Sequence, residues 1–418
     1  MINDVLKRTE KVIARFAVIS DVHITHIGEG KYPFEQTLKL FSQLNPDGYV
    51  FAGDLAYMTE KSGGGICEKL YPKAYDIVNQ LLDEYAKEVP RVIAIGNHEY
   101  PQCNSEPQIS RWAKQLFENK FGVKINDHQI IKGYHFITIG GDSWDNNFSE
   151  ETEKWAEREI DEAISEDVHK PVFVVFHKPP YCTVVNSQKE PVLMSESFRA
   201  FLNSRQQIIN ITGDLHIPAQ DPKTIWQDGF TVIQVPLNAV GQIMFDGCAK
   251  GTRMTEDKYS QGLIIDITHK AVRVYRVDTL LPKLLGEVWE IDVNDKENWK
   301  YTDRRFKENI IPYFEKDVMP EIKYEDGELT LRIRDAVCWK NNIESFPQYY
   351  DVKILDKQGK CVCRERVISE YYMTERSGYF EYSKRIVLNG DCIVEITPIS
   401  SFYKSGQVVV AKITIHQE

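Results

Sequence analysis

Five short, near-continuous apolar runs stand out in the first half of the chain, at residues 15–20, 48–52, 91–95, 172–176 and 207–212. Apolar runs of this length, without polar alternation, are typical of strands that are buried on both faces. Between them, residues 69–87 and the stretch from Ser149, a good N-cap, to Glu166 have the apolar spacing of amphipathic helices. This alternation of strand and helix predicts an α/β domain with a largely buried sheet.

The pattern changes after residue 275. Residues 281–320 contain prolines and are irregular, and from residue 321 onward short strand patterns alternate with turn signals. The expected strands are 329–333, 350–355, 392–397 and 408–415, with turns at Asp326-Gly327, Gln358-Gly359 and Asn389-Gly390. Short strands at this spacing favour an all-β sandwich of about 100 residues. We therefore expect two domains, 1–310 and 311–418, the second an accessory β-sandwich similar to fibronectin type III.

Composition narrows the class of protein. Of 418 residues, 42% are apolar and 27% charged, which is the balance of a soluble globular protein. No run of about 18 apolar residues predicts a membrane span, and no signal peptide is evident, so we expect a cytoplasmic protein. A net charge of −11 gives no footprint for nucleic acid, and the 8 cysteines form no C-x-x-C pair. The oligomeric state stays open.

Each of the five apolar runs in the first domain ends in residues that can bind a metal ion. In chain order, these ends are Asp21-Val22-His23, Gly53-Asp54, Gly96-Asn97-His98-Glu99, His177 and Gly213-Asp214-Leu215-His216. Ligands of open α/β sheets bind at the carboxyl ends of the strands. The repeated pattern therefore predicts one site where the five ends meet.

The residue types at these ends suit metal coordination. Carboxylate, imidazole and carboxamide groups are ligands for Zn, Fe, Mn or Mg-class ions. Glycine before Asp54, Asn97 and Asp214 lets the backbone turn sharply and approach a bound ion. A lone histidine is usually an ordinary core or surface residue, and an isolated Gly-Asp pair is usually a turn. Five such elements in fixed order, each closing a strand, favour a metal site over that reading.

This ordered set resembles the calcineurin-like metallophosphoesterase family, whose pattern is D-x-H, G-D, G-N-H-[DE], H and G-H-x-H. The resemblance covers roughly residues 14–280. It implies a double β-sheet sandwich flanked by helices, with two metal ions bound at the strand ends. It also implies hydrolysis of a small phosphorylated substrate.

Carried over residue by residue, the resemblance implies two metal ions of the Mn, Fe, Zn or Mg class. One ion would be bound by Asp21, His23, Asp54 and His216. The other would be bound by Asp54, Asn97, His177 and Asp214, so that Asp54 bridges the two. His98 would be the catalytic residue, lying beside the metals without binding them. Glu99 would orient His98 or shape its hydrogen bonding.

Two positions depart from the family pattern. Asp214 stands where the family usually has histidine. Either the second metal site has lost a ligand and is empty, or the carboxylate of Asp214 replaces the imidazole as ligand. We favour replacement, because carboxylate is itself a good metal ligand. The stretch from Gly53 to Tyr57 is similar to the G-D-x-x-Y of purple acid phosphatases, in which the tyrosine binds ferric iron. This chain keeps His23, which would compete with Tyr57 for that position. We expect His23 to bind the metal and Tyr57 to lie behind the ligands or face the substrate.

Three hypotheses for function follow. The leading one is a dinuclear-metal-dependent phosphomonoesterase or phosphodiesterase, in which a metal-bridging hydroxide attacks phosphorus and His98 protonates the leaving group. The second, motivated by Asp214, is a metal- or ligand-binding protein on a degraded phosphoesterase scaffold. The third places the main activity in the C-terminal sandwich as an adhesion or carbohydrate-binding module.

Other residues of the first domain are candidates for a substrate cleft. Tyr100, Trp144 and Tyr181 follow strand ends and serve either to line the cleft or to pack the core. Segment 181–205 is long, and loops of this kind often set specificity.

Overall fold

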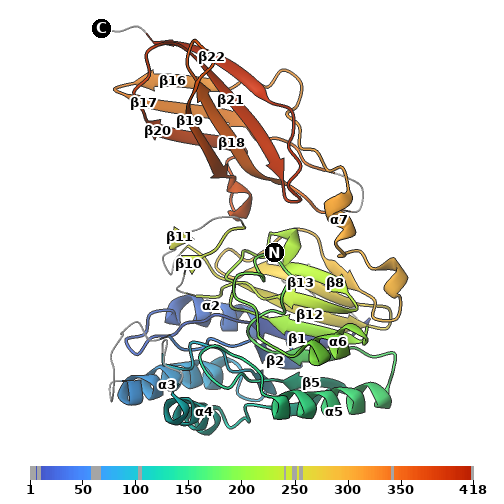
Figure 1. The fold of residues 1–418 in the computed structure, drawn as a ribbon. Coiled ribbons are helices and arrows are strands. Elements are labelled where there is room, and N and C mark those ends of the chain that lie inside the picture. The colour runs from blue at the N-terminus through green and yellow to red at the C-terminus, as the bar shows by residue number, and fades with distance from the viewer. Residues whose placement is uncertain are drawn as a thin grey trace. The chain divides into compact units, whose positions relative to one another are not determined.

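The computed structural model describes Leu6 and residues 11–57, 67–101, 106–239, 242–246, 252–253, 258–339 and 343–415. The chain divides into two compact units (Figure 1). The first comprises Met1–Ala219 with Lys223–Thr302, and the second comprises Gln220–Pro222 with Asp303–Glu418. None of the described helices is both long enough and apolar enough to cross a membrane.

The first unit contains two mixed β-sheets, of which one has the order β14-β13-β12-β1-β2-β3, with β15 paired to β13. Its strands are β1 (Val12–Ile19), β2 (Gly48–Phe51), β3 (Arg91–Ile93), β12 (Gln261–Thr268), β13 (Val272–Asp278), β14 (Lys283–Leu284) and β15 (Trp289–Ile291). Strands β1, β2 and β3 are parallel, with Phe16 opposite Gly48 and Tyr49 opposite Arg91. Their carboxyl ends therefore lie at one edge of the sheet.

The second sheet has the order β4-β5-β6-β7-β9-β8. Its strands are β4 (Asp127–Ile131), β5 (Tyr134–Thr138), β6 (Val172–Val175), β7 (Ile208–Thr212), β8 (Ile225–Asp228) and β9 (Phe230–Gln234). Strands β5, β6, β7 and β9 are parallel. A separate short pair consists of β10 (Gln242–Ile243) and β11 (Thr252–Arg253).

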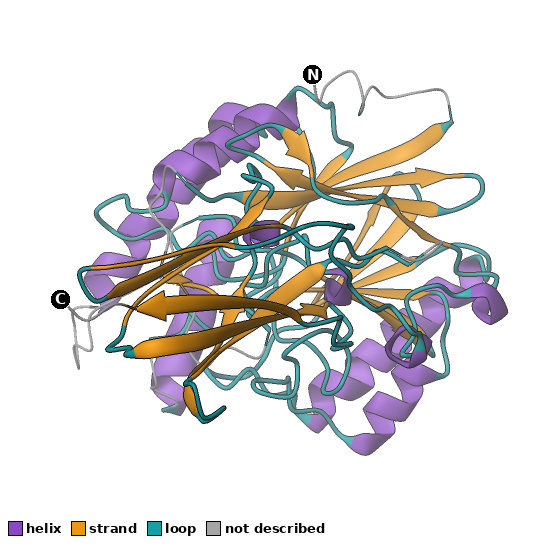
Figure 2. Cartoon of the chain, turned by 90° about the horizontal axis from the view of Figure 1, so that it is seen from above, coloured by secondary structure: helices purple, strands orange, loops and turns teal. Residues whose placement is uncertain are grey.

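The two sheets pack on each other, and helices cover their outer faces. Phe16 and Val50 of the first sheet share one apolar core with Phe173 and Ile209 of the second. The first sheet's other face packs with α2 (Lys31–Ser42), α3 (Cys67–Tyr85) and α4 (Pro107–Phe121), and the second's with α5 (Glu150–Glu166) and α6 (Glu196–Asn203). Figure 2 shows helices on opposite sides of the strands. The predicted double β-sheet sandwich flanked by helices is confirmed.

The local signals in the sequence explain these elements. Every residue of β2, β6 and β7 is buried, as the near-continuous apolar runs predicted. Helix α5 begins directly after Ser149, whose side chain accepts a hydrogen bond from the Thr152 N–H, so the predicted N-cap is present. The predicted strands and helices differ from the observed ones by a few residues at their ends.

The second unit is an all-β sandwich preceded by α7 (Arg304–Lys307). Its sheets have the orders β16-β17-β20 and β19-β18-β21-β22, and every described pairing is antiparallel. The strands are β16 (Glu321–Glu325), β17 (Glu328–Arg334), β18 (Pro347–Leu355), β19 (Cys361–Ile368), β20 (Tyr379–Arg385), β21 (Gly390–Ser400) and β22 (Val409–Ile415). Leu331, Tyr350 and Val394 belong to its apolar core. The predicted additional β-sandwich is confirmed, whereas its likeness to fibronectin type III and the boundary at residue 310 stay predictions.

Candidate metal centre

The two sheets bring their carboxyl edges together. Strand β1 leads into Asp21 and His23. Directly after the strand, Ser20 forms a parallel bridge with Leu237. Because Leu237 follows β9 of the other sheet, this bridge joins the two edges. The remaining predicted ligands also follow strands that end here: Asp54 after β2, Asn97 after β3, His177 after β6, and Asp214 and His216 after β7.

Five of the seven predicted ligands have a left-handed backbone. The φ angles are 55° at Asp21, 53° at His23, 54° at Asp54, 70° at Asp214 and 50° at His216. Conformations of this kind cost on the order of 1–3 kcal/mol per residue and persist only where the surrounding structure holds them. They cluster at functional sites. Here the peptide N–H groups of residues 22 and 23 donate to the Asp54 carbonyl at 2.8 and 3.0 Å, which fixes the two loops against each other.

The glycines before the ligands are needed for close approach. A Cβ atom added at Gly96 would lie 2.1 Å from Asp54 Oδ1, and one at Gly53 would lie 2.5 Å from His177 Nδ1. At Gly213, an added Cβ would lie 2.6 Å from Asp21 Oδ2. These contacts are too short for any side chain, so the glycines leave room for the ligand side chains themselves.

The first predicted group of ligands forms one cluster. Asp21, His23, Asp54 and His216 each offer a ligand atom, and these atoms all lie within 4.8 Å of one another. The two Nε2 atoms of His23 and His216 are 3.1 Å apart, and His216 Nε2 lies 3.2 Å from Asp21 Oδ1. Such mutual proximity of imidazole nitrogens and carboxylate oxygens suits a shared cation.

The second predicted group lies next to the first and shares Asp54 with it. His177 Nε2 is 3.0 Å from Asp54 Oδ2, in a geometry that makes no hydrogen bond, and 3.7 Å from Asp214 Oδ1. Asn97 is buried, and its Oδ1 atom has no hydrogen-bond partner. Asp214, the position that departs from the family pattern, therefore lies among the other predicted ligands.

Buried polar atoms without partners test whether this site fits metal ions. Four such atoms belong to predicted ligands: Asp21 Oδ2, Asn97 Oδ1, His177 Nε2 and Asp214 Oδ2. A buried polar atom left without a partner costs about 1–3 kcal/mol, so their concentration here needs an explanation. Ligation of cations would satisfy all four, because each is an atom type that binds metal. The residues fit the metal ions that the sequence predicts.

Hydrogen bonds on the far side of two imidazole rings fix which nitrogen faces the site. His177 Nδ1 lies 2.7 Å from the Ala52 carbonyl, and His216 Nδ1 lies 3.0 Å from the Gln242 carbonyl. A carbonyl only accepts, so each Nδ1 carries the proton and donates it. In the neutral form of each ring, Nε2 then has the lone pair that a metal ligand requires, and it faces the site.

The electrostatics of the cluster also favour a cation. Burial raises the pKa of the Asp214 carboxyl to about 7, and burial together with the adjacent His216 lowers the pKa of His23 to about 3. Burial disfavours the charged form of His177, but Asp54 and Asp21 outweigh it and raise its pKa to about 10. Without a cation at neutral pH, His177 and part of the Asp214 carboxyl groups hold protons that metal binding would displace, whereas His23 is already neutral.

His98 lies beside the cluster and outside it. Its Nε2 atom is 3.9 Å from Asp54 Oδ2, and its peptide N–H donates to Asp54 Oδ1 at 2.9 Å. The rings of Tyr57 and Trp144 meet the His98 ring edge-on, with centroids 4.7 and 4.9 Å away. The side chain is 18% exposed, so it faces the cavity from between two aromatic rings.

Glu99 holds the loops and not the His98 ring. Its carboxylate accepts hydrogen bonds from the peptide N–H groups of Gly96 at 2.6 Å, Asp54 at 2.9 Å and Ala56 at 3.0 Å. It thereby ties the loop after β3 to the loop after β2. The sequence suggested a role for Glu99 toward His98, and the structure places that role in the backbone that carries His98 and Asp54.

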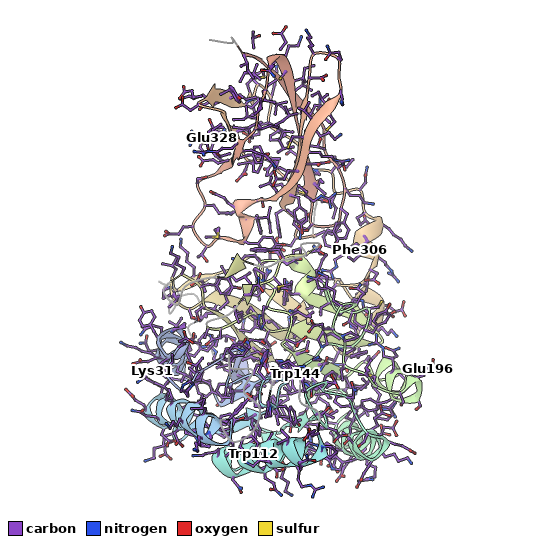
Figure 3. All side chains as sticks on the ribbon, turned by 60° about the vertical axis from the view of Figure 1, so that its left-hand side comes forward. Lys31, Trp112, Trp144, Glu196, Phe306 and Glu328 are labelled. Atoms are coloured by element: carbon purple, nitrogen blue, oxygen red, sulfur yellow. The ribbon has the colours of Figure 1, made fainter. Side chains whose placement is uncertain are left out.

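A cavity of about 650 Å³ opens over the cluster. It is lined by His23, Thr25, Glu29, Asp54, Tyr57, Asn97, His98, Trp144, Asn186, Lys189, Glu190, Asp214, Leu215, His216, Gln242 and Met244. Trp144, labelled in Figure 3, lines the cavity, which is one of the two roles that the sequence left open for it. Tyr100 belongs to the core, where its hydroxyl donates to the Gly141 carbonyl, and Tyr181 is 59% exposed and does not line the cavity.

Several lining residues had no signal in the sequence. Asn186, Lys189 and Glu190 lie in segment 181–205, for which a role in specificity was predicted without naming residues. Glu29 and Gln242 could not be found, because neither follows a strand end with a motif.

Residues 242–246, which we call the strap segment, support His216 from the side away from the cluster. Besides the Gln242 carbonyl that orients the ring, the Met244 N–H donates to the His216 carbonyl at 3.0 Å. The segment is anchored by Asp246, whose Oδ2 atom lies 3.3 Å from Lys223 Nζ, with both side chains under 10% exposed. Removing one partner of such a buried pair is strongly destabilising, so this anchor keeps the strap in place.

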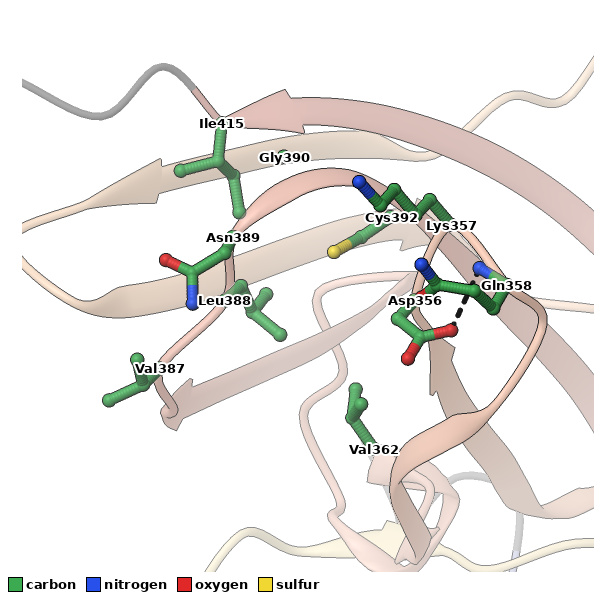
Figure 4. A pocket seen from close by; sticks show the side chains of 10 residues that line it. All are labelled: Asp356, Lys357, Gln358, Val362, Val387, Leu388, Asn389, Gly390, Cys392 and Ile415. Atoms are coloured by element: carbon green, nitrogen blue, oxygen red, sulfur yellow. Dashed lines mark hydrogen bonds between the residues drawn. The ribbon is translucent and has the colours of Figure 1, made fainter.

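The second unit has a cavity of its own, of about 620 Å³, at one end of its sandwich (Figure 4). Val362, Val387 and Leu388 line it together with the turns at Asp356 and Asn389. Across the described residues, the only group of three or more clustered metal-ligand side chains is the one in the first unit.

Comparison with known proteins finds a family match over part of the chain and similarity to solved structures. Residues 14–218 match the sequence pattern described as calcineurin-like phosphoesterase. No curated protein sequence matches the chain. A dimetal phosphatase from Danio rerio is similar in structure, at 13% identity and a TM-score of 0.48, covering 68% of this chain and 99% of that one. Vps29 from Entamoeba histolytica complexed with Zn²⁺ has 10% identity and a TM-score of 0.32, covering 67% and 99%.

Proposed function

This chain belongs to the calcineurin-like phosphoesterase family through residues 14–218, and on that premise we propose that it is a dinuclear-metal-dependent phosphoester hydrolase. The observation that carries the proposal is the set of four buried ligand-type atoms without partners, on Asp21, Asn97, His177 and Asp214, beside a cavity large enough for a substrate. A fold alone does not imply an activity, whereas such a set of atoms has a specific chemical use.

Each of the two ions would take four ligands from the chain. The proposed sets are Asp21, His23, Asp54 and His216 for one ion, and Asp54, Asn97, His177 and Asp214 for the other. When bound, two such ions polarise the phosphoryl group and activate a water molecule as nucleophile. The chain's own part is to hold the donors in place, through the glycines, the Glu99 carboxylate and the carbonyl partners of the two Nδ1 atoms.

His98 acts on the leaving group in this proposal. It faces the cavity, and the backbone hydrogen bond to Asp54 fixes its position relative to the cluster without using the ring. A positioned imidazole that protonates the leaving oxygen typically contributes about 10²–10⁴-fold to the rate. Tyr57 and Trp144 confine the ring, so it meets the substrate in one orientation.

Metal stoichiometry and turnover test the proposal together. The protein reconstituted with Mn²⁺, Zn²⁺ or Fe²⁺ should bind close to two ions per chain by elemental analysis and should hydrolyse 4-nitrophenyl phosphate or its bis ester. A chelator should abolish both. Two bound ions without hydrolysis of any phosphoester would favour the alternative, a metal-binding protein on a degraded phosphoesterase scaffold.

Asp214 variants test the second ion specifically. Asp214→Ala should lose one ion and most hydrolysis, whereas Asp214→His should keep two ions, since imidazole is also a metal ligand. The histidine variant gains one unit of positive charge, so the acid limb of its pH–rate profile should move to lower pH. If Asp214→Ala kept both ions and full activity, Asp214 would not be a ligand.

A further inference from the structure

We infer that the substrate is a phosphodiester with an aromatic or apolar leaving group, and not a phosphomonoester dianion. This inference rests on the proposed function and names the substrate class of the same site. Two features of the cavity carry it: its charge, and the aromatic and apolar side chains that line it.

The charge of the loaded cavity favours a substrate with a single negative charge. Asp21, Asp54 and Asp214 contribute three negative charges, which two divalent ions and one activated water, counted as hydroxide, bring to zero. Outside the ligand set, the described lining residues add two negative charges, from Glu29 and Glu190, and one positive charge, from Lys189. His98, which also lines the cavity, carries one positive charge when it holds the proton that it donates, so the sum is zero and a monoanion leaves less net charge in the cavity than a dianion does. A phosphomonoester is mostly a dianion at neutral pH, and a phosphodiester is a monoanion.

Asp214 is central to this count. With histidine at that position, as the family pattern has it, the sum would be one unit more positive, which would offset one charge of a dianion. Glu190 also lines the cavity, so a carboxylate outside the ligand set faces the same space as Asp214. A second negative charge on the phosphoryl group would meet both, and its electrostatic cost is removed when the oxygen carries an uncharged substituent.

The His98 side of the cavity suits an apolar leaving group. Because His98 protonates the leaving oxygen in the proposed function, the group attached to that oxygen lies next to Tyr57 and Trp144, whose rings flank His98. A planar leaving group gains contact area and aromatic packing against these two rings. Trp144 is half-buried, so part of its surface is open to the cavity.

The cavity has room for the substituent that stays on phosphorus. Leu215 and Met244 add apolar side chains to its lining, and the volume of about 650 Å³ is within the range that holds a whole small molecule. A phosphomonoester would leave more of this volume to water than a phosphodiester does.

Relative kcat/KM values test the inference. With two ions bound, bis(4-nitrophenyl) phosphate should exceed 4-nitrophenyl phosphate by at least about tenfold, equivalent to a transition-state difference of about 1.4 kcal/mol. If neither ester is hydrolysed by the two-ion protein, the proposed function fails. If the monoester is preferred, the proposed function stands and the inference about the substrate fails.

Five variants, two of which are controls, locate the effect. Glu190→Gln should raise kcat/KM for the monoester about fivefold and change that for the diester less than about twofold, since it removes one negative charge from the cavity. The matched control is Glu150→Gln, at a side chain 82% exposed on α5. Trp144→Ala should lower kcat/KM for the diester about tenfold more than for the monoester. Trp144→Phe should retain most of it, and Trp339→Phe, at an exposed tryptophan of the second unit, is the control.

Binding without turnover gives a separate readout. In metal-loaded His98→Ala, calorimetry should find diphenyl phosphate bound more tightly than inorganic phosphate at pH 8, where inorganic phosphate is a dianion. Tighter binding of inorganic phosphate, or equal effects of Glu190→Gln on both ligands, would overturn the inference.

Discussion

The glycines beside the metal cluster of the first unit and those in two turns of the second have opposite surroundings. In the first, Cβ atoms added at Gly96 and Gly213 would each lie 2.1 Å from a side-chain oxygen at the carboxyl edge of the sheets. In the second, Cβ atoms added at Gly327 and Gly359 would meet nothing within 4 Å. The first kind of glycine leaves space for other side chains, whereas the second kind only supplies a backbone conformation.

Positive φ angles at these two places also serve different purposes. In the second unit, Asp326 and Gly327 have φ of 50° and 75° in the turn between β16 and β17, where the chain simply reverses. In the first unit, similar angles at Asp54 and His216 aim ligand side chains at one point. At an exposed turn, a positive φ angle only reverses the chain. Where buried polar atoms without partners accompany it, the same conformation indicates a functional site.

The sharpest test of this comparison is a pair of alanine substitutions. Gly96→Ala should abolish metal binding at the shared Asp54 and lower kcat/KM by more than about 10³-fold, because the new Cβ would overlap Asp54 Oδ1. Gly327→Ala should lower the free energy of unfolding by about 1 kcal/mol, through its positive φ alone, and leave turnover unchanged. Elemental analysis, kinetics and denaturant unfolding measure these effects. Equal effects of the two substitutions on metal content would contradict the comparison.

A smaller effect is expected at His98. His98→Ala should lower kcat about 10²–10⁴-fold while both ions stay bound, because the ring lies beside the cluster without belonging to it. His269→Ala, at an exposed histidine after β12, is the matched control. Loss of metal together with activity would make His98 a ligand or a structural support. His98 would then belong to the metal cluster and would not be only its neighbour.

The strap segment provides a weaker perturbation of the same centre. Asp246→Asn should reduce metal affinity about 10–100-fold, because it removes the charge partner of Lys223 and loosens the carbonyl that orients His216. Competition with a chromogenic chelator measures the affinity, and Asp228→Asn, at an exposed position on the β8–β9 turn, is the control. The neutral variant is preferred to a deletion of the side chain because it keeps the volume. Unchanged affinity in Asp246→Asn would show that the strap does not support the site.

The smallest expected effect is a dependence of metal binding on pH. Asp54 and Asp21 raise the pKa of His177 to about 10, so without metal this ring is protonated at neutral pH, and it must lose that proton to bind. Metal affinity should therefore rise between pH 6 and pH 8, and binding should release protons. Calorimetry in two buffers of different ionisation enthalpy counts them, and binding without proton release would be inconsistent with the protonation of His177.

The residues that the sequence could reveal are those whose signal is local. Strands β2, β6 and β7 are buried throughout, so each has a near-continuous apolar sequence. A predicted ligand follows each of these strands in the sequence. Segment 181–205 was expected to matter because of its length, and three of its residues line the cavity. In both cases, neighbours in the sequence carry the information.

The remaining features depend on contacts between distant parts of the chain. Gln242 orients His216 through its carbonyl, and every residue has a carbonyl, so its side chain gives no signal. Glu99 is next to His98 in sequence, but its carboxylate meets the Asp54 and Ala56 peptides, which are more than 40 residues away. The position of Trp144 against His98 likewise follows from packing of the two sheets, which no short motif encodes.

The bridge between the two sheets has a consequence for biosynthesis. His23 and His216 meet at the centre although they are 193 residues apart, and Ser20 pairs with Leu237 still further along. Closing so long a loop is slow, and on a ribosome it has to wait until the later strand has emerged. A nascent chain that ends before β7 lacks Asp214 and His216, so neither of the two proposed ligand sets is complete. On the proposed function, both ions would therefore bind only after β7 and the residues that follow it have been synthesised, and metal shortage would act at a late step of maturation.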